Sequence, residues 1–112
     1  MMQIEEIKKG HVHILYLSGS LDNPDAHELI KKLTGLIEAG EQNVLLNLEN
    51  LTYISSSGLR ALAGATQRMQ RKDGKLFLCS LEGLVKRVVV DIMHFDKVFT
   101  IYETEEDALQ HF

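Results

Sequence analysis

Short apolar runs alternate along this chain with longer segments in which apolar residues recur at helical spacing. The run Val44-Leu45-Leu46-Asn47-Leu48 is nearly continuous and bounded by polar residues, which is typical of a strand covered on both faces in a parallel sheet. Residues 75–79 predict a second buried strand and residues 98–102 a last one. Because strands that alternate with helices build layered sheets, this order predicts the α/β class, with helices on one or both faces of a mixed sheet.

The first 40 residues predict a hairpin followed by a helix. Residues 12–17 alternate as a half-buried strand does, and a short strand at residues 4–8 pairs with them through Lys9-Gly10. In the helix that follows, we expect Asn23 to be the N-cap and Gly40 to end the helical pattern.

The second predicted helix begins near the serines at positions 55–57 and ends at Asp73-Gly74. Its apolar and polar residues separate onto two faces at helical spacing. The inner face is marked by Leu59, Leu62, Ala63, Thr66 and Met69, and the outer face by Arg60, Gly64, Gln67 and Arg71.

Two shorter helices are predicted in the last third of the chain. Ser80 is expected to cap a helix that reaches Ile92, although the β-branched Val88-Val89-Val90 is by itself also compatible with a strand. Thr104 and Asp107 resemble the capping box of a closing helix.

Length and composition favour one domain over residues 1–112. The order of elements predicts a mixed sheet of about five strands with about four α-helices packed against it. The 12 basic and 16 acidic residues give a net charge of −4 without a long basic run, so nucleic acid is not expected as a direct partner. No eighteen apolar residues run together, and acids stand where a secretory signal has its apolar core. We therefore expect a cytoplasmic protein without membrane insertion. Cys79 lies in an apolar stretch, so we expect its thiol to be buried and inert.

Three hydroxyls and a glycine stand where an apolar segment gives way to the second helix, in the run Tyr53-Ile54-Ser55-Ser56-Ser57-Gly58-Leu59-Arg60. The unpaired N–H groups and the positive dipole end of a helix start stabilise negative charge, so a phosphate on one serine is compatible with the fold. A structural role is the alternative, because Ser56 or Ser57 can cap the helix, worth about 1 kcal/mol. Gly58 costs helix propensity and suits the close approach of another surface.

Catalysis is not expected from this run. A nucleophilic elbow requires Gly-x-Ser-x-Gly, whereas Ile54 and Ser55 precede Ser56, and no histidine is marked by its spacing as a base. His11 and His13 point to one face of a strand, but no further ligand completes a metal set. A phosphate-binding Gly-x-x-x-x-Gly-Lys-Ser/Thr loop does not occur, so no cofactor and no metal are expected.

The order of elements and four motifs together resemble the STAS domain, and within it the bacterial anti-sigma factor antagonists. The segment 17–22 resembles the family's strand-end signature, 44–48 its central strand and 104–109 its closing helix. Ile54-Ser55-Ser56-Ser57-Gly58-Leu59 resembles the family's Asp-Ser-Ser-Gly-Leu phosphorylation motif, with Ser55 in place of the frequent aspartate. The resemblance covers nearly the whole chain.

The resemblance implies a regulatory binding protein. In that family the unphosphorylated antagonist binds an anti-sigma factor that is a serine kinase and thereby frees a sigma factor, and phosphorylation of the antagonist reverses this. Carried across the motif, the phosphorylated serine is Ser56, with a phosphatase as a second partner. The expected partner-binding residues are Asp22, Ser55, Ser57, Gly58, Arg60 and Gly64.

Two other functions are considered beside this one. One is a STAS module that serves as a fixed scaffold or accessory subunit in a signalling or lipid-transport complex, without a phosphorylation cycle. The other is a small hydrolase with Ser56 as its nucleophile. With no coiled-coil heptads and no large apolar stripe on the expected surface, we expect a monomer or a weak dimer.

Overall fold

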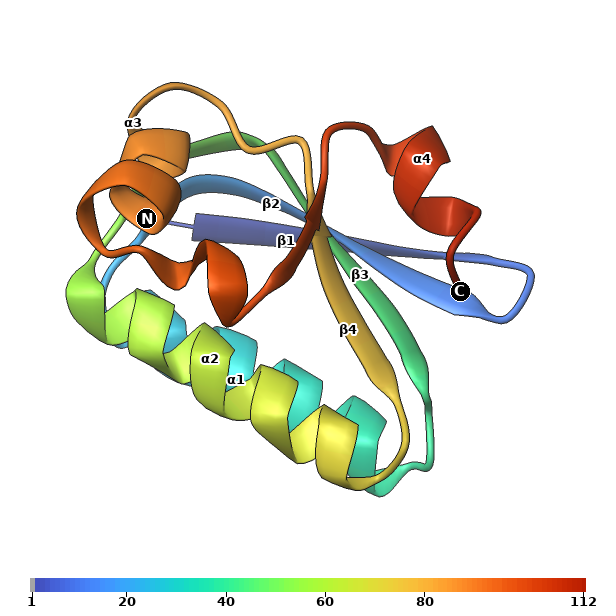
Figure 1. Ribbon diagram of the computed structural model, residues 1–112. Coiled ribbons are helices and arrows are strands. Elements are labelled where there is room, and N and C mark those ends of the chain that lie inside the picture. Colours follow the sequence, from blue (N-terminus) through green and yellow to red (C-terminus); the bar gives the residue numbers. More distant parts are fainter. Residues whose placement is uncertain (1) are drawn as a thin grey trace.

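The computed structural model describes residues 2–112 and contains a five-stranded mixed sheet whose strands lie in the order of the sequence (Figure 1). Strands β1 and β2 are antiparallel, and each later strand is parallel to the one before it. The strands are β1 (Met2–Lys9), β2 (Val12–Leu21), β3 (Asn43–Ile54), β4 (Lys75–Cys79) and β5 (Thr100–Tyr102). The predicted mixed sheet of five strands with four α-helices is confirmed.

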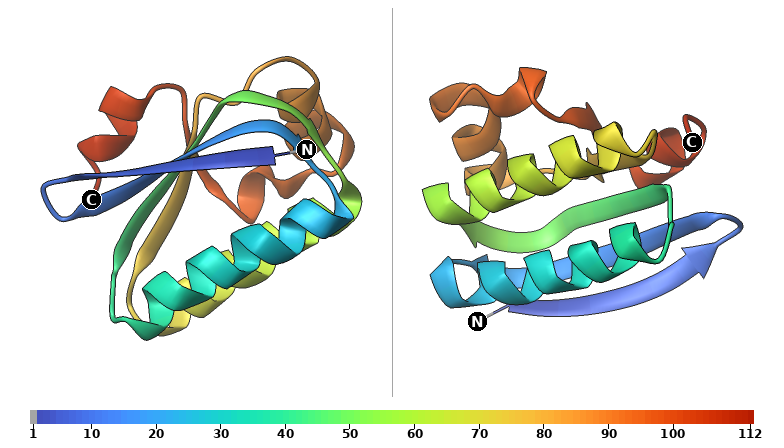
Figure 2. Two further views of the ribbon diagram at one scale, coloured as in Figure 1. Left: turned by 180° about the vertical axis from the view of Figure 1, so that it is seen from behind. Right: turned by 90° about the horizontal axis from the view of Figure 1, so that it is seen from below.

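Helices cover the two faces of the sheet unequally. The long helices α1 (Asn23–Glu38) and α2 (Ser56–Arg71) lie side by side on one face, whereas the short α4 (Glu105–Leu109) lies on the other (Figures 1 and 2). The larger core lies between the sheet and the two long helices, and a smaller core lies beneath α4. Cys79 is fully buried in the smaller core, as predicted.

The hairpin is confirmed, and the start of α1 is one residue from the prediction. Gly10 has a φ of +60° at the first position of the two-residue turn, a conformation that glycine adopts without strain. The N-cap position of α1 is Asp22, because the Ala26 N–H donates to the Asp22 carbonyl at 2.8 Å and closes the first turn there. Asn23 is therefore the first helical residue, and its assignment as the cap was wrong.

Strand β3 is much longer than the apolar run 44–48 that predicted it. It continues to Ile54 because β2 also continues to Leu21, and the two strands pair up to their last residues across two register shifts. Beyond Leu48 only Leu51 and Ile54 are buried and the other side chains of β3 are exposed, so the continuous apolar run ends while the backbone pairing continues. The extension carries the chain directly to the serines.

The third helix differs most from its prediction. Ser80 does not cap it, because Ser80 has a φ of +62°, outside the extended conformation of an N-cap, and its N–H still donates to the Tyr102 carbonyl. The α-helical part, α3 (Gly83–Lys86), is one turn long, and a π-helical segment (Arg87–Ile92) continues it through the three valines. The valines are thus helical and form no strand.

The end of the chain follows the prediction in part. A 3-10 turn (Phe95–Lys97) precedes β5, and the N–H groups of Val98 and Phe99 donate to the Phe95 carbonyl, so β5 begins only at Thr100. The Thr104 hydroxyl accepts a hydrogen bond from the Asp107 N–H at 3.0 Å and caps α4 as expected. Within residues 2–112, no helix combines the length and the apolar character needed to cross a bilayer.

Candidate functional site

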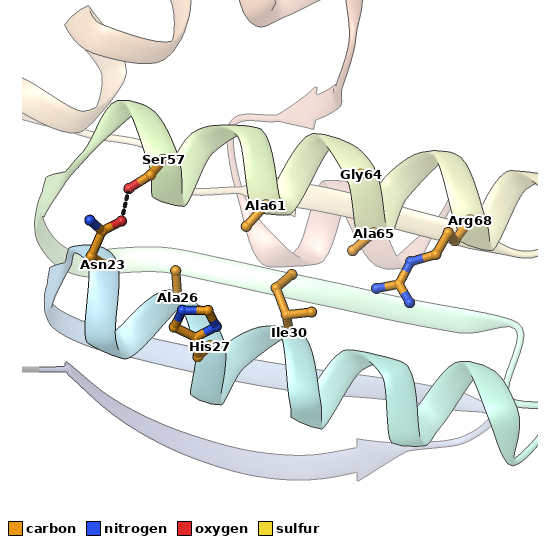
Figure 3. A pocket seen from close by; sticks show the side chains of 9 residues that line it. All are labelled: Asn23, Ala26, His27, Ile30, Ser57, Ala61, Gly64, Ala65 and Arg68. Atoms are coloured by element: carbon orange, nitrogen blue, oxygen red, sulfur yellow. Dashed lines mark hydrogen bonds between the residues drawn. The ribbon is translucent and has the colours of Figure 1, made fainter.

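The candidate site lies where two parallel strands end and two helices begin. The last residues of β2 and β3, Leu21 and Ile54, are paired, and the Ser55 N–H donates to the Leu21 carbonyl at 2.9 Å. The hydroxyl of Ser57, the second residue of α2, donates to the side-chain oxygen of Asn23, the first residue of α1 (Figure 3). The N-termini of α1 and α2 are therefore joined, and both present unpaired backbone N–H groups at the same edge of the sheet.

The three serines have different environments. Ser55 is the N-cap of α2, since its extended backbone lets its hydroxyl accept the Gly58 N–H at 3.0 Å. The Ser55 and Ser57 hydroxyls lie 3.1 Å apart and are hydrogen-bonded to each other. Capping by Ser56 or Ser57 was the wrong assignment, because a side-chain cap reaches the N–H three residues on and the helix already includes Ser56.

Ser56 is the serine whose hydroxyl is open. It is the first residue of α2 and is exposed, whereas Ser55 and Ser57 are partly buried. Within the described part of the chain, the Ser55 and Ser57 hydroxyls take part in side-chain hydrogen bonds and the Ser56 hydroxyl in none. The local fold thus occupies two hydroxyls of the motif and leaves the middle one accessible.

Gly58 is buried, and the surface that approaches it belongs to this chain. A Cβ atom at this position would stand 3.0 Å from the Leu21 Cγ and 3.1 Å from the Leu21 carbonyl oxygen. The glycine therefore allows α2 to begin against the end of β2. Its contribution to the site is to place Ser56, since Gly58 itself is covered.

Asp22 lies at the N-cap position of α1, next to the start of α2. Its carboxylate makes no cap hydrogen bond, and its Oδ1 atom is buried without a hydrogen-bond partner among residues 2–112. Two neighbouring helix N-termini favour a negative charge here. The structure thus places Asp22 in the same junction as the serine motif.

Arg60 and Gly64 follow Ser56 at intervals of four residues, so the three form an exposed stripe along α2. Gly64 also borders a groove of about 350 Å³ between α1 and α2. The floor of this groove is largely apolar and includes Ala26, Ile30, Ala61 and Ala65 (Figure 3). The sequence did not reveal the groove, because each helix supplies one wall and the pairing of the walls depends on the sheet beneath.

The histidines considered for catalysis or metal binding have other surroundings. His13 contacts Glu6 and Glu41 through its two ring nitrogens, at 2.9 and 2.7 Å, and His11 is exposed in the hairpin turn. Across residues 2–112, no three His, Cys, Asp or Glu side chains are arranged to hold a metal ion. The site offers an open hydroxyl and a charged, hydrogen-bonding surface, which suits recognition and modification.

The family model of the STAS domain matches residues 3–108, nearly the whole described chain. The chain belongs to the STAS domain family. The family predicted from the serine motif and the order of elements is thereby confirmed.

Relatives of this STAS domain are named as anti-sigma factor antagonists. BtrV of Bordetella bronchiseptica, which carries that name, is 33% identical over 99 residues, or 88% of this chain and 84% of its own length. The anti-sigma F factor antagonist of Paenibacillus polymyxa is 29% identical over 96% of this chain and 92% of its own length. These names describe regulators and not enzymes.

Solved structures of the anti-sigma factor antagonist SpoIIAA share the fold. Its unphosphorylated form has a TM-score of 0.76 and 21% identity, covering 99% of this chain and 96% of that one. The phosphorylated form of SpoIIAA from Bacillus has a TM-score of 0.73 and 20% identity, covering 99% and 98%. At this identity the likeness establishes the fold of the STAS domain and no more.

Proposed function

We propose that this protein is an anti-sigma factor antagonist that binds an anti-sigma factor serine kinase while Ser56 is unphosphorylated, and so frees a sigma factor. Phosphorylation of Ser56 switches it off, and a phosphatase restores it. The proposal takes residues 1–112 as one domain acting in the cytoplasm. Its main support is the exposed Ser56 hydroxyl between two serines that are held by hydrogen bonds, together with the names of the relatives.

The start of α2 tolerates a phosphate. Phosphoserine carries about −1.5 to −2 charges at neutral pH, and the helix dipole favours such a charge in the first turn. Arg60 lies on the same face of α2 one turn further on and is exposed, within the spacing at which helical side chains pair. Phosphorylation is therefore expected to leave the fold intact.

The same phosphate opposes binding of a partner. The surface to be covered includes Asp22 and the stripe of Ser56, Arg60 and Gly64, while Ser55, Ser57 and Gly58 hold the loop in place. In a closely packed interface the phosphate must be desolvated, and a partner surface that offers it no further cation does not offset this cost. A loss of about 3 kcal/mol weakens an affinity more than a hundredfold, so the switch requires no change in the conformation of the antagonist.

Phosphate transfer to defined variants tests the site. The kinase is recovered from the native cell by pull-down with the wild-type chain and then incubated with ATP and each variant. We expect the wild type and the matched control Ser57→Ala to be labelled, and Ser56→Ala to remain unlabelled. Persistent labelling of Ser56→Ala would reject Ser56 as the acceptor.

Calorimetric titration of the kinase tests the switch separately. Ser56→Ala is expected to bind as the wild type does, and Ser56→Asp to bind at least tenfold more weakly. Equal binding by both variants contradicts a switch based on charge.

A scaffold without a phosphorylation cycle is the second candidate, and Ser55 is the observation that favours it. The residue that precedes the acceptor lacks the carboxylate that the family frequently has at this position. Mass spectrometry of the protein from cells in several growth phases distinguishes the two functions. A stable partner together with no phosphate on Ser56 in any phase supports the scaffold.

A further inference from the structure

Among residues 2–112, the outer edge of β1 is unpaired. β1 is the first strand of the sheet and pairs with β2, and no helix or strand of the described residues lies beyond it (Figure 2). Residues 5–9 are all exposed, and Ile7 keeps 41% of its surface accessible. A free edge of this length is able to pair with another strand through its backbone.

The charges along this edge are antisymmetric about Ile7. The segment Glu5-Glu6-Ile7-Lys8-Lys9 has two acids before the isoleucine and two bases after it. When the segment pairs antiparallel with a second copy and Ile7 lies opposite Ile7, each glutamate lies opposite a lysine. Glu5 then faces Lys9 of the second copy, and Glu6 faces Lys8, so four cross-strand pairs of opposite charge form.

The backbone geometry fits the same register. A two-residue hairpin turn closes on hydrogen bonds between its flanking residues, here Lys9 and Val12, and hydrogen-bonded pairs alternate along an antiparallel ladder. The backbone groups of Lys9 and Ile7 therefore face β2, and those of Glu6 and Lys8 face the free edge. These are the residues whose N–H and C=O groups meet when the two copies are centred on Ile7.

We propose that β1 pairs with β1 of a second copy of this chain, antiparallel and centred on Ile7, to form a two-fold dimer with a continuous ten-stranded sheet. A two-fold axis perpendicular to the sheet keeps the same face of both sheets on one side. In every register that it allows, odd-numbered residues of β1 therefore pair with odd-numbered residues, and even-numbered with even-numbered. The neighbouring centres place Glu6 opposite Glu6 or Lys8 opposite Lys8, and the next one towards the N-terminus places Glu5 opposite Glu5. Of these registers, the one centred on Ile7 places each of the four charged residues opposite a residue of opposite charge.

Charges on an edge strand also serve to prevent aggregation. That role requires no particular order of acids and bases, whereas the antisymmetric order selects one register and rejects its neighbours. Glu6 contacts His13 and Lys32 within its own chain, and Lys9 contacts Glu105. Within residues 2–112, Glu5 and Lys8 have no ion pair, so each new pair joins a free charge to an existing one.

The size of the interface sets the expected strength. Pairing one short strand buries less than the roughly 1,200 Å² at the lower limit of stable interfaces, so we expect a dimer with a dissociation constant in the micromolar range or weaker. Ser56 follows β3, two strands from this edge. The dimer leaves both copies of Ser56 open, and the inference is independent of the proposed function.

Disulfide trapping tests the register. Cα atoms in a pair without hydrogen bonds lie about 4.5 Å apart, within the range a disulfide spans, so Ile7→Cys is expected to crosslink to itself under mild oxidation. Glu5→Cys is the matched control. In this register position 5 of one copy faces position 9 of the other, so the two introduced cysteines are too far apart to form a disulfide. The native Cys79 is buried and does not interfere. No crosslink at position 7, or equal crosslinking at positions 5 and 7, overturns the proposal.

Charge reversal tests the pairing by sedimentation equilibrium over a range of protein and salt concentrations. Glu5→Lys and Lys9→Glu are each expected to weaken the wild-type dimer about tenfold, since each turns two attractive pairs into repulsive ones. The double variant Glu5→Lys/Lys9→Glu is expected to restore it, because opposite charges again face each other across the axis. A wild type that stays monomeric throughout, or a double variant no better than the single variants, contradicts the proposed pairing.

Discussion

At the scale of single residues, Ser55 explains how the motif departs from its family without losing its local structure. Serine and aspartate are both strong N-caps, since each presents an oxygen to the N–H three residues on. Ser55 accepts the Gly58 N–H at 3.0 Å, so the cap survives. The difference lies in the charge beside Ser56, which concerns the proposed kinase and binding partner more than the fold.

Removal of this cap is expected to reduce stability by a predictable amount. Ser55→Ala should lower the free energy of unfolding by about 1 kcal/mol, whereas Ser55→Asp should keep it within a few tenths or raise it through the helix dipole. Urea denaturation followed by circular dichroism measures both. Ser56→Ala is the control, since its hydroxyl makes no bond to lose, and an equal loss in Ser56→Ala and Ser55→Ala contradicts the assignment of the cap.

At the scale of elements, α2 contains two glycines with opposite surroundings. Gly58 is pressed against the end of β2, where an added Cβ would meet the Leu21 Cγ and carbonyl oxygen. Gly64 lies in the middle of the helix, and apart from its chain neighbours and the adjacent helical backbone no atom lies within 4 Å of an added Cβ. Packing within the fold requires the first glycine, whereas it does not require the second, which lowers helix propensity.

Alanine at these two positions is expected to change stability in opposite directions. Gly58→Ala should destabilise by about 1 to 3 kcal/mol, since the carbonyl of β2 is not a flexible neighbour. Gly64→Ala should stabilise by up to about 1 kcal/mol, because alanine restores helix propensity without a clash. Thermal unfolding of the two variants provides the comparison, and a stabilising Gly58→Ala disproves close packing at the start of α2.

At the scale of the whole molecule, Glu105 joins the short helix α4 to the sheet. Its carboxylate accepts hydrogen bonds from Lys9 at 3.0 Å and from Asn47 at 3.1 Å, so it connects α4 with β1 and β3. Burial raises the pKa of Glu105, but hydrogen bonds from Tyr16, Lys9 and Asn47 outweigh it and hold the pKa below 4.5. Burial, followed by the neighbouring Glu105, raises the pKa of Tyr16 to about 12.

This arrangement makes the stability depend on pH in acid. Because the pKa of Glu105 is lower in the folded state than its ordinary 4.5, its ionised form stabilises the fold above that pH, and this contribution is lost as the pH falls through the folded value. Glu105→Gln should therefore be less stable than the wild type between about pH 5.5 and 7, and the difference should shrink below about pH 4.5. Urea unfolding at several pH values measures it, and a difference that persists unchanged at about pH 3 contradicts the role of the carboxylate.

The sequence by itself determined the elements and their order, because strand and helix periodicity, turn residues and the cap at Thr104 are local properties. It also determined the family, since the order of elements and the four motifs that identify it, the serine motif among them, lie in contiguous segments. Local patterns did not locate the full length of β3, because it depends on pairing with β2. They also did not locate Asp22 as the cap position of α1 or the π-helical valines.

Only the tertiary structure decided what the three serines do. The hydroxyl of Ser57 is held by Asn23, which is 34 residues away in the sequence, and Gly58 is covered by Leu21. Both contacts exist because β2 and β3 are parallel and end together. The sequence shows the residues of the motif but not which hydroxyl is accessible. The pairing of two distant strand ends leaves Ser56 exposed while its neighbours Ser55 and Ser57 are partly buried and hydrogen-bonded.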